Sequence, residues 1–388
     1  MSAEDFIQWE LQELKNATLY RTLRSVESAQ EPVLTVDGRE VLNFSSNNYL
    51  GLANHPKLAA AAKEAIDRYG CGSGASRLIS GNMTLHEELE RRLAEFKGSE
   101  AALVFNSGFQ ANTGILSTLT GEGDAILSDA LNHASIIDGC RLSRAKTFVY
   151  PHCDLDRLES LLKQAERCRR KLIVTESIFS MDGDEAPLGA IVELAERHGA
   201  SVMVDEAHAT GLFGAGGAGV VAKLGLGDRV LVQMGTLGKA LGGFGAYVAG
   251  SQALRELLIN RCRSFVFTTA LPPAVMAMAI AALDLVQSEP ERREALWNNC
   301  RRLATGLRAL GFHIGESASP ILPLIIGEAA KCMRFSEQLF ERGVFAQGIR
   351  PPTVPEGTSR LRVTLMATHT RAHIERALAV FTEVGRLQ

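Results

Sequence analysis

Short apolar runs alternate with helical patterns from about Ala101 onward. The runs, rich in β-branched and aliphatic residues, are ALVF, AILS, KTFVY, KLIVTE, SVMVDEA, RVLVQM and GAYVAG. Parallel strands need crossover helices, and strands that are covered on both faces read as continuous apolar segments. The pattern therefore predicts an α/β fold in which a mostly parallel seven-stranded sheet is sandwiched by helices.

The segments on either side of this region predict two further parts. Residues 1–45 read as an N-terminal arm, a helix followed by a small hairpin whose turn is Asp37-Gly38. The large domain is expected over residues 46–287, ending with an apolar helix that starts near Ala270. A charged amphipathic helix, the runs ILPLII and SRLRVTL and a helix between them predict a smaller α+β domain over residues 288–388.

Polar side chains follow several of the predicted strands. Lys239 lies in the glycine-rich segment GTLGKALGG, Asp205 and His208 follow SVMV, and Glu176 and Ser180 follow KLIVT. Ligands of such sheets bind beyond the carboxyl ends of the strands, where desolvation lowers the pKa of a lysine and makes its amine nucleophilic. Schiff-base chemistry needs an electron sink, and pyridoxal phosphate supplies one if a carboxylate such as Asp205 pairs with its ring nitrogen.

Two other loops complete a candidate cofactor site. The segment Ser107-Gly108-Phe109 opens a helix after a strand, where backbone N–H groups favour a phosphate. His133 falls in another loop at the sheet edge, where its imidazole could lie flat on a cofactor ring. The segment GAGGAG from Gly214 matches the dinucleotide motif GxGxxG, but no strand runs directly into it. We interpret it as a glycine-rich loop over the cofactor.

Composition excludes several classes of partner. The 388 residues are 46% hydrophobic and 22% charged, with a net charge of −3 and no long basic block, so nucleic acid is not an expected partner. No secretory signal is visible, and the longest apolar stretch is too interrupted to span a bilayer, so no membrane partner is expected. Seven cysteines without CxxC spacing indicate reduced thiols in the cytoplasm and no metal site.

Five segments, in this order and spacing, resemble the α-oxoamine synthase group of fold-type I pyridoxal-phosphate transferases: FNSGFQAN, LNHASIIDG, TESIFSMDGD, VDEAHATG and GTLGKALGG. Three others, NFSSNNYLGLANHP, GCGSGASRLISGN and IRPPTVPEGTSRLRVTL, resemble the members that join L-alanine to a pimeloyl thioester. The resemblance implies a decarboxylative condensation to 8-amino-7-oxononanoate, carbon dioxide and the free thiol carrier, in biotin biosynthesis. It also implies a homodimer with shared active sites.

The resemblance implies a role for each matching residue. Lys239 would form the Schiff base and act as general base, Asp205 would pair with the pyridinium nitrogen, and His208 would bond the 3-hydroxyl. The implied cofactor contacts also include Ser107, Gly108, Phe109, His133 (stacked on the ring), Ser180, Thr236, and Thr268 and Thr269, which serve the neighbouring subunit. The implied substrate contacts are Arg21, Asn47, Ser76, His133, Thr353 and Arg362.

Several alternatives stay open at this point. Arg362 is the expected anchor of the substrate carboxylate, but Arg350 and Arg360 compete for that role, and Arg360 is expected to be a surface charge. The acyl carrier is either coenzyme A or acyl carrier protein. Alternative functions are a glycine C-acetyltransferase-type condensation, an aminotransferase, and a non-catalytic module that binds pyridoxal phosphate.

Overall fold

The structure is a computed structural model that describes residues 2–17 and 19–386, and these form two compact units. The large unit comprises Leu50–Ser180 and Asp184–Arg293. The small unit comprises Met181–Gly183 and the described residues up to Tyr49 and from Glu294 onward. The division into three parts at residues 45 and 287, suggested by the sequence, stays a prediction.

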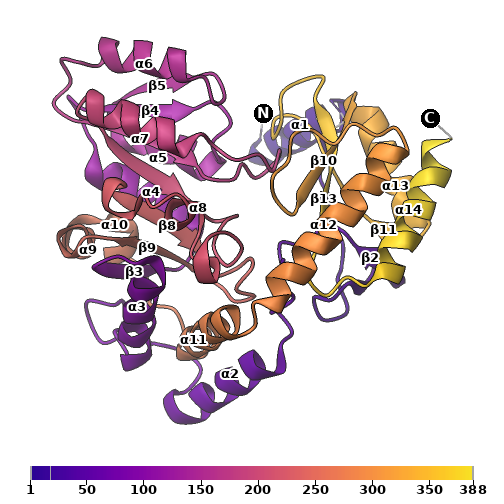
Figure 1. The fold of residues 1–388 in the computed structure, drawn as a ribbon, viewed down its shortest axis with the longest axis horizontal. Coiled ribbons are helices and arrows are strands. Elements are labelled where there is room, and N and C mark those ends of the chain that lie inside the picture. The colour runs from indigo at the N-terminus through magenta and orange to yellow at the C-terminus, as the bar shows by residue number, and fades with distance from the viewer. Residues whose placement is uncertain (1, 18, 387–388) are drawn as a thin grey trace. The chain divides into compact units, whose positions relative to one another are not determined.

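A seven-stranded sheet forms the centre of the large unit (Figure 1), with the strand order β3-β9-β8-β7-β6-β4-β5. Its strands are β3 (Ala101–Phe105), β4 (Ala125–Asp129), β5 (Lys146–Tyr150), β6 (Lys171–Glu176), β7 (Ser201–Asp205), β8 (Val232–Thr236) and β9 (Ala246–Gly250). The neighbouring pairs are parallel, except that β9 runs antiparallel to β3 and β8. The predicted mostly parallel seven-stranded sheet is confirmed.

Helices cover the sheet because its strands are apolar on both faces: β3 and β4 are buried at every position, whereas the edge strand β5 is mostly exposed. The helices are α2 (Pro56–Tyr69), α3 (Thr84–Lys97), α4 (Gly108–Leu119), α5 (Ala134–Ser143), α6 (Leu155–Gln164), α7 (Leu188–Arg197), α8 (Val220–Lys223), α9 (Gln252–Arg261), α10 (Arg263–Val266) and α11 (Pro273–Ser288), with 3₁₀ turns at Ala215–Gly217 and Gly227–Arg229. Ile115 of α4 and Ile136 of α5 belong to the core cluster that includes Phe105 and Met234.

The parallel strands place their carboxyl ends at one edge of the sheet. Asp129, Glu176, Asp205 and Thr236 are the last residues of β4, β6, β7 and β8. Glu176 pairs in register with Asp205, so the two carboxyl groups end adjacent strands. The loops that carry the candidate residues therefore leave the sheet on the same side, where ligands of such folds bind.

The small unit contains two three-stranded sheets, ordered β1-β2-β11 and β10-β13-β12. Its elements are α1 (Ala3–Asn16), β1 (Val33–Val36), β2 (Arg39–Asn43), most of α12 (Glu291–Ala309), β10 (Ile321–Gly327), α13 (Ala329–Glu341), β11 (Val344–Phe345), β12 (Gln347–Ile349), β13 (Ser359–Thr364) and α14 (Arg371–Gly385). The predicted hairpin is confirmed, because Asp37 and Gly38 both have positive φ between the antiparallel strands β1 and β2.

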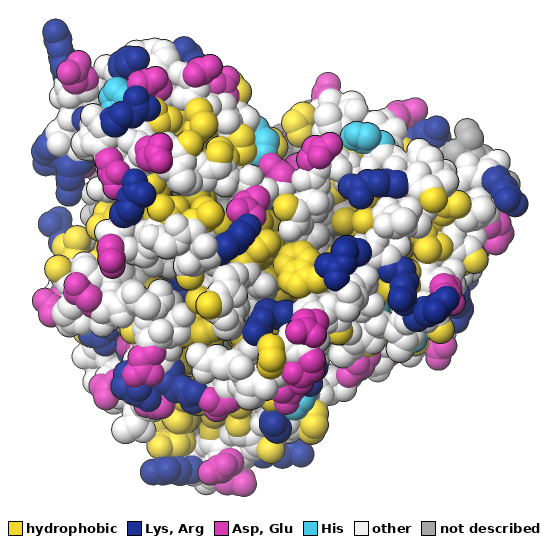
Figure 2. All heavy atoms as spheres, in the orientation of Figure 1, with side chains coloured by type: hydrophobic (Ala, Val, Ile, Leu, Met, Phe, Trp, Pro, Cys, Tyr) yellow, Lys and Arg dark blue, Asp and Glu magenta, His cyan; other side chains and the backbone are white. Residues whose placement is uncertain are grey.

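The surface shows no single-sign field on the face in Figure 2, where Lys and Arg side chains are interspersed with Asp and Glu. None of the helices in the described part of the chain is both long enough and apolar enough to cross a membrane. The apolar helix expected near Ala270 is α11. One side of this helix is buried in the large unit, through residues that include Met276, Leu283 and Val286.

Candidate active site

Lys239 lies in a tight turn directly after β8. Thr236 Oγ1 accepts a hydrogen bond from the N–H of Gly238 at 3.1 Å, and the carbonyl of Lys239 accepts from the N–H of Gly242 at 2.9 Å. Gly242 has φ +64, and a Cβ there would lie 2.5 Å from backbone atoms of Leu52 and Ala53, so this turn requires glycine. The turn brings the Lys239 amine to 2.8 Å from Nε2 of His208.

Asp205 presents a buried carboxylate at the end of β7, only 4% exposed. Its Oδ2 accepts a hydrogen bond from Asn112 Nδ2 at 2.8 Å, and its Oδ1 accepts one from the N–H of Ala207 at 2.9 Å. Asn112 Nδ2 also donates to Ser135 Oγ at 2.9 Å. These neutral donors fix the carboxylate without neutralising it, so a buried negative charge is held in place for a cationic partner.

His133 caps the N-terminus of α5, with its Nδ1 2.8 Å from Ser135 Oγ. Burial lowers the pKa of His133, an effect that the Lys239 charge reinforces and the Asp205 charge opposes. The imidazole is therefore neutral near pH 7, a form that can stack on an aromatic ring without adding a charge.

The N-terminus of α4 is the candidate anion site. Ser107 is its N-cap and accepts from the N–H of Gln110 at 3.1 Å, which leaves the N–H groups of Gly108 and Phe109 in the first turn. The candidate segment Thr268 to Thr269 lies beside it, because Asn106 Nδ2 donates to the Thr269 carbonyl at 2.9 Å. Ser76 forms an isolated antiparallel bridge with Thr269. A contact of these threonines with a neighbouring subunit stays a prediction.

The residue that follows Asp205, Glu206, belongs to a buried ion pair that the sequence did not reveal. Lys97 of α3 and Glu206 have fully buried side chains and pair with each other. Glu206 also accepts from the N–H of Val221 at 2.9 Å, and Lys97 donates to the carbonyl of Ala218. A Cβ on Gly219 would lie 2.4 Å from the Glu206 carboxylate. The segment GAGGAG therefore packs on this ion pair, which gives its last glycine a packing role.

His152 joins two loops at the same edge of the sheet. Its Nδ1 lies 3.0 Å from Asp129 Oδ1 and its Nε2 lies 2.8 Å from Asp184 Oδ2. Burial lowers the pKa of His152, but the bonds to the two carboxylates outweigh it and raise the pKa to about 12. Asp154 caps the N-terminus of α6, and its Oδ1 accepts from the N–H of Arg157 at 2.8 Å.

The sulfur of Cys153 lies close to His152, so that Asp129, His152 and Cys153 bring three potential ligand atoms within 4.8 Å of one another. The sulfur is 3.8 Å from Nδ1 and 3.7 Å from Nε2 of the ring. Both ring nitrogens of His152 already face a carboxylate oxygen, so in this arrangement the ring directs no free lone pair toward a metal ion. The group is an imidazolium held between two carboxylates.

In the small unit, Arg362 of β13 is buried and oriented by neutral groups. Its Nη1 donates to Asn47 Oδ1 at 3.0 Å, and its Nη2 lies 3.4 Å from the Tyr49 hydroxyl. Arg360 differs from expectation, since it is only 5% exposed and forms an ion pair with Asp182. The sequence interpretation of Arg360 as a surface charge is wrong, because β13 lies in the middle of its sheet and is buried at every position.

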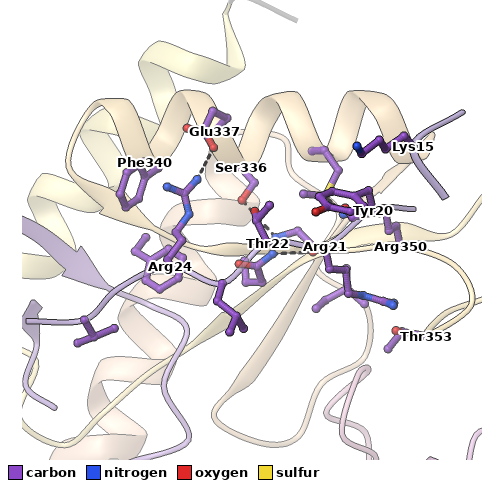
Figure 3. A pocket seen from close by; sticks show the side chains of 17 residues that line it. Lys15, Tyr20, Arg21, Thr22, Arg24, Ser336, Glu337, Phe340, Arg350 and Thr353 are labelled. Atoms are coloured by element: carbon purple, nitrogen blue, oxygen red, sulfur yellow. Dashed lines mark hydrogen bonds and ion pairs between the residues drawn. The ribbon is translucent and has the colours of Figure 1, made fainter. Parts of the chain in front are cut away.

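A cavity of about 710 Å³ in the small unit brings Arg21 and Thr353 together (Figure 3). Its other lining residues are Lys15, Tyr20, Thr22, Leu23, Arg24, Val26, Met333, Ser336, Glu337, Phe340, Phe345, Gln347, Gly348, Ile349 and Arg350. Glu337, the one carboxylate in this lining, pairs with Arg24, as the dashed line in Figure 3 shows. Four basic side chains therefore line the cavity against one acidic side chain.

Arg350 is the buried member of this cationic lining. Its Nη2 donates to the Tyr20 carbonyl at 2.7 Å, whereas its buried Nε has no hydrogen-bond partner among the residues that the structure describes. Burial lowers the pKa of Arg350, and repulsion from Arg21 lowers it further. An anion bound in the cavity would raise the pKa of Arg350 again, because a nearby opposite charge favours the charged form of the guanidinium.

The large unit thus carries an amine, a buried carboxylate, a neutral flat imidazole and a helix N-terminus at one sheet edge. This set fits pyridoxal phosphate, whose aldehyde, ring nitrogen, ring face and phosphate require those four groups. With the mostly parallel sheet, it defines a fold-type I pyridoxal-phosphate enzyme.

Comparison with known proteins agrees with this class. The model of the family "Aminotransferase class I and II" matches residues 39–381. The chain is 53% identical to an 8-amino-7-oxononanoate synthase of Symbiobacterium thermophilum over 387 residues, covering 100% of this chain and 99% of the relative. It is 54% identical to an 8-amino-7-oxononanoate synthase of Geobacter sulfurreducens over 382 residues, covering 98% of each.

Solved structures extend the comparison. A structure of SPT with pyridoxal phosphate has a TM-score of 0.93 at 35% identity, covering 99% of this chain and 97% of that one. An 8-amino-7-oxononanoate synthase of Francisella tularensis has a TM-score of 0.77 at 30% identity, covering 89% and 98%. The chain therefore belongs to the aminotransferase class I and II family and, within it, to the family of 8-amino-7-oxononanoate synthases. The predicted cofactor, pyridoxal phosphate, is confirmed.

Proposed function

We propose that this protein is an acyltransferase that condenses L-alanine with a pimeloyl thioester, releasing carbon dioxide and the thiol carrier and forming 8-amino-7-oxononanoate for biotin biosynthesis. The observation that carries the proposal is the coexistence of two built sites. The large unit holds the complete set of groups for pyridoxal phosphate, and the small unit holds a cationic cavity suited to a substrate with a free carboxylate.

In this proposal each residue at the sheet edge has a defined role. Bound pyridoxal phosphate supplies an electron sink that acidifies the α-carbon of an amino acid. Lys239 binds the cofactor and takes the α-proton as general base, while His208, 2.8 Å from the amine, orients it and bonds the 3-hydroxyl with Ser180. Asp205 keeps the ring nitrogen protonated, and His133 covers the ring face.

The phosphate contacts are proposed at the start of α4. Ser107, Gly108 and Phe109 offer the helix N-terminus, with Thr236 beside the lysine turn. Thr268 and Thr269, held next to α4 by Asn106, are proposed to serve the site of a second subunit in a homodimer. Ser76 bridges Thr269 and is proposed to contact substrate.

Two sets of cationic groups are proposed for the two substrate carboxylates. Arg362, held by Asn47, binds the carboxylate of alanine through its planar fork. Arg21 and Thr353 bind the distal carboxylate of the pimeloyl group in the cavity, where Arg350 adds a buried charge. Arg360 is committed to Asp182, so we exclude it from the substrate contacts.

The proposed location is the cytoplasm, where the seven cysteines, all unpaired, would stay reduced. The acyl carrier, coenzyme A or acyl carrier protein, is left to experiment.

A four-way assay tests the function. Purified holoenzyme is given alanine or glycine with pimeloyl-CoA or acetyl-CoA, and thiol release and carbon dioxide are both measured. We expect turnover to be highest for alanine with pimeloyl-CoA. Preference for glycine with acetyl-CoA would indicate the glycine C-acetyltransferase-type reaction, and turnover of keto acids without carbon dioxide would indicate an aminotransferase.

The control is Lys239→Ala, which removes the proposed base. A fall of about 10²- to 10⁴-fold in turnover is expected from the loss of general base catalysis alone. If the variant keeps full turnover, the role of Lys239 is wrong. If wild-type protein binds pyridoxal phosphate but turns over none of the four pairs, the non-catalytic module becomes the better description.

A further inference from the structure

Glu176 is a buried carboxyl group at the cofactor edge of the sheet to which the proposed mechanism gives no task. It is the last residue of β6 and only 3% exposed. Its register partner on β7 is Asp205, so two carboxyl groups end adjacent strands in a buried setting. Such a pair is costly unless each carboxyl is bound by donors or one of them is protonated.

The hydrogen bonds of Glu176 join two loops that leave different strands. Its Oε1 accepts from the backbone N–H of His133 at 2.6 Å, in the loop after β4. It also accepts from the backbone of Ser180, in the loop after β6. His133 and Ser180 are the residues proposed to touch the cofactor ring and its hydroxyl, and a single side chain sets the backbone of both.

The charges around Glu176 determine its protonation. Burial raises the pKa of Glu176 to about 8, the neighbouring Asp205 charge adds to the rise, and Lys239 and the two backbone bonds oppose it. The facing groups are Asp205 from β7, Lys239 from the turn after β8 and His133 from the loop after β4. At neutral pH the carboxyl is therefore mostly protonated, which leaves Asp205 as the negative charge of the pair.

We propose that Glu176 is a positioning residue of the cofactor site, whose carboxyl group accepts from the backbone of both the His133 and the Ser180 loops and holds them together beside Asp205. The proposal rests on the cofactor contacts assigned to His133 and Ser180, and it does not depend on which acyl substrate the enzyme uses. A neutral acceptor of the same shape should therefore replace Glu176, whereas removal of the acceptor should loosen both loops.

The experiment compares Glu176→Gln and Glu176→Ala with wild-type holoenzyme. The dissociation constant of pyridoxal phosphate is measured at pH 7 by absorbance titration of protein stripped of cofactor. We expect Glu176→Gln to stay within about threefold of wild type, because the amide oxygen can still accept a backbone hydrogen bond. We expect Glu176→Ala to bind the cofactor about 30-fold more weakly, as for the loss of two neutral hydrogen bonds.

A second readout separates positioning from a general loss of stability. The visible absorbance of bound cofactor is titrated from pH 6 to 10, where ionisation of Glu176 would place a second negative charge beside Asp205. We expect wild type to show a transition near pH 8 that Glu176→Gln lacks. This titration still decides the question if Glu176→Ala fails to fold.

The matched control is Glu90→Gln, which removes another buried carboxylate of the large unit. Glu90 binds Arg77, Arg255 and the N–H of Val104, none of which belongs to the loops of His133 and Ser180. We expect it to lower the unfolding temperature but to leave the pH titration of the cofactor unchanged. The proposal is overturned if Glu176→Ala binds cofactor like wild type, if Glu176→Gln binds as weakly as Glu176→Ala, or if Glu176→Gln keeps the transition near pH 8.

The outcome of this test does not depend on whether the proposed function is correct. Cofactor affinity and its pH titration are measured without any acyl substrate, so an unexpected substrate preference leaves the proposal about Glu176 intact. Conversely, an unchanged titration in Glu176→Gln would remove the positioning role while the four-way assay stands.

Discussion

The sheet edge of the large unit and the cavity of the small unit differ in how their charges are balanced. At the sheet edge of the large unit, most charges are balanced within the protein: Lys97 pairs with Glu206 and His152 lies between two carboxylates, while Asp205 is held by two neutral donors. The cavity of the small unit has four basic side chains against one acidic one, and a buried nitrogen of Arg350 without a partner among the described residues.

This difference indicates what each region binds. A site matched within the protein is rigid before its ligand arrives, which suits a cofactor that must be held in one orientation. A cavity with surplus positive charge gains its balancing charge only from the ligand, which suits an anionic substrate that binds and leaves. Three variants test this comparison, and a pair of glycine variants adds a smaller contrast between the units; they follow in order of decreasing expected effect.

The largest effect is expected from Lys97→Met, which leaves the Glu206 carboxylate buried without its cation. The free energy of unfolding should fall by about 3–5 kcal/mol, as when one partner of a buried ion pair is removed. Urea unfolding of the holoenzyme measures this loss. The double variant Lys97→Met with Glu206→Gln should recover much of it, because no buried charge remains. A single variant as stable as wild type would show that the pair is not energetically important.

A smaller loss is expected from His152→Gln, about 2 kcal/mol for charge-assisted hydrogen bonds to Asp129 and Asp184. The folded-state pKa of His152, about 12, lies above the ordinary value of 6.5, so this stabilisation is fully present below about pH 6.5. It is lost progressively as the pH rises above 6.5. The stability difference between wild type and variant should therefore shrink steadily above pH 6.5.

The control for this change is His198→Gln. The Nε2 of His198 lies 3.4 Å from Oε1 of Glu159, a long contact near the surface. Replacing His198 should therefore change the free energy of unfolding by less than about 0.5 kcal/mol. A difference for His152→Gln that grows with pH would contradict the imidazolium bridge.

The next variant, Arg21→Ala, tests the cationic cavity. It should raise the KM for pimeloyl-CoA about 10- to 100-fold, the range for a hydrogen bond to a charged group, with a smaller change in kcat. The KM for heptanoyl-CoA, whose acyl chain is uncharged, should change little, because that chain has no distal carboxylate. Arg371→Ala, on α14 outside the cavity lining, is the matched control. Equal effects on both acyl chains would remove the distal carboxylate from the cavity.

The smallest effect is expected at a glycine of the small unit. Gly38 has φ +72 and open space where a Cβ would lie, so Gly38→Ala should cost only the backbone strain, about 1 kcal/mol of unfolding free energy. Gly189 of α7 in the large unit also has open space but no positive φ. Gly189→Ala should therefore stabilise by up to about 1 kcal/mol, and thermal unfolding of both variants measures the contrast.

Much of the fold could be predicted because short, local sequence patterns specify its strands and turns. Each of the seven apolar runs between residues 102 and 250 became a strand of the large sheet, and Asp37-Gly38 formed the expected turn. The antiparallel strand β9 and the parallel pairing of β2 with β11 were not visible. The partners Leu42 and Val344 are about 300 residues apart, and no local period encodes such a pairing.

In the candidate site, too, some residues could be predicted from the sequence and others could not. Lys239, Asp205 and His208 could be found from their places after strands, since parallel strands bring their carboxyl ends to one edge. Glu176 was visible at its strand end, but its bonds to the loops of His133 and Ser180 were not. Arg360 was misjudged because an arginine in a short alternating strand gives no sign of a buried partner such as Asp182.

The sequence by itself determined the strand order along the chain, the class of sheet and the lysine and aspartate that a pyridoxal-phosphate enzyme needs. Only the tertiary structure decided which charges meet: Lys97 with Glu206, His152 with Asp129 and Asp184, and Arg360 with Asp182. The physical reason is that periodicity and turn chemistry act over a few residues, whereas the pairing of buried charges depends on long-range packing that brings distant segments together.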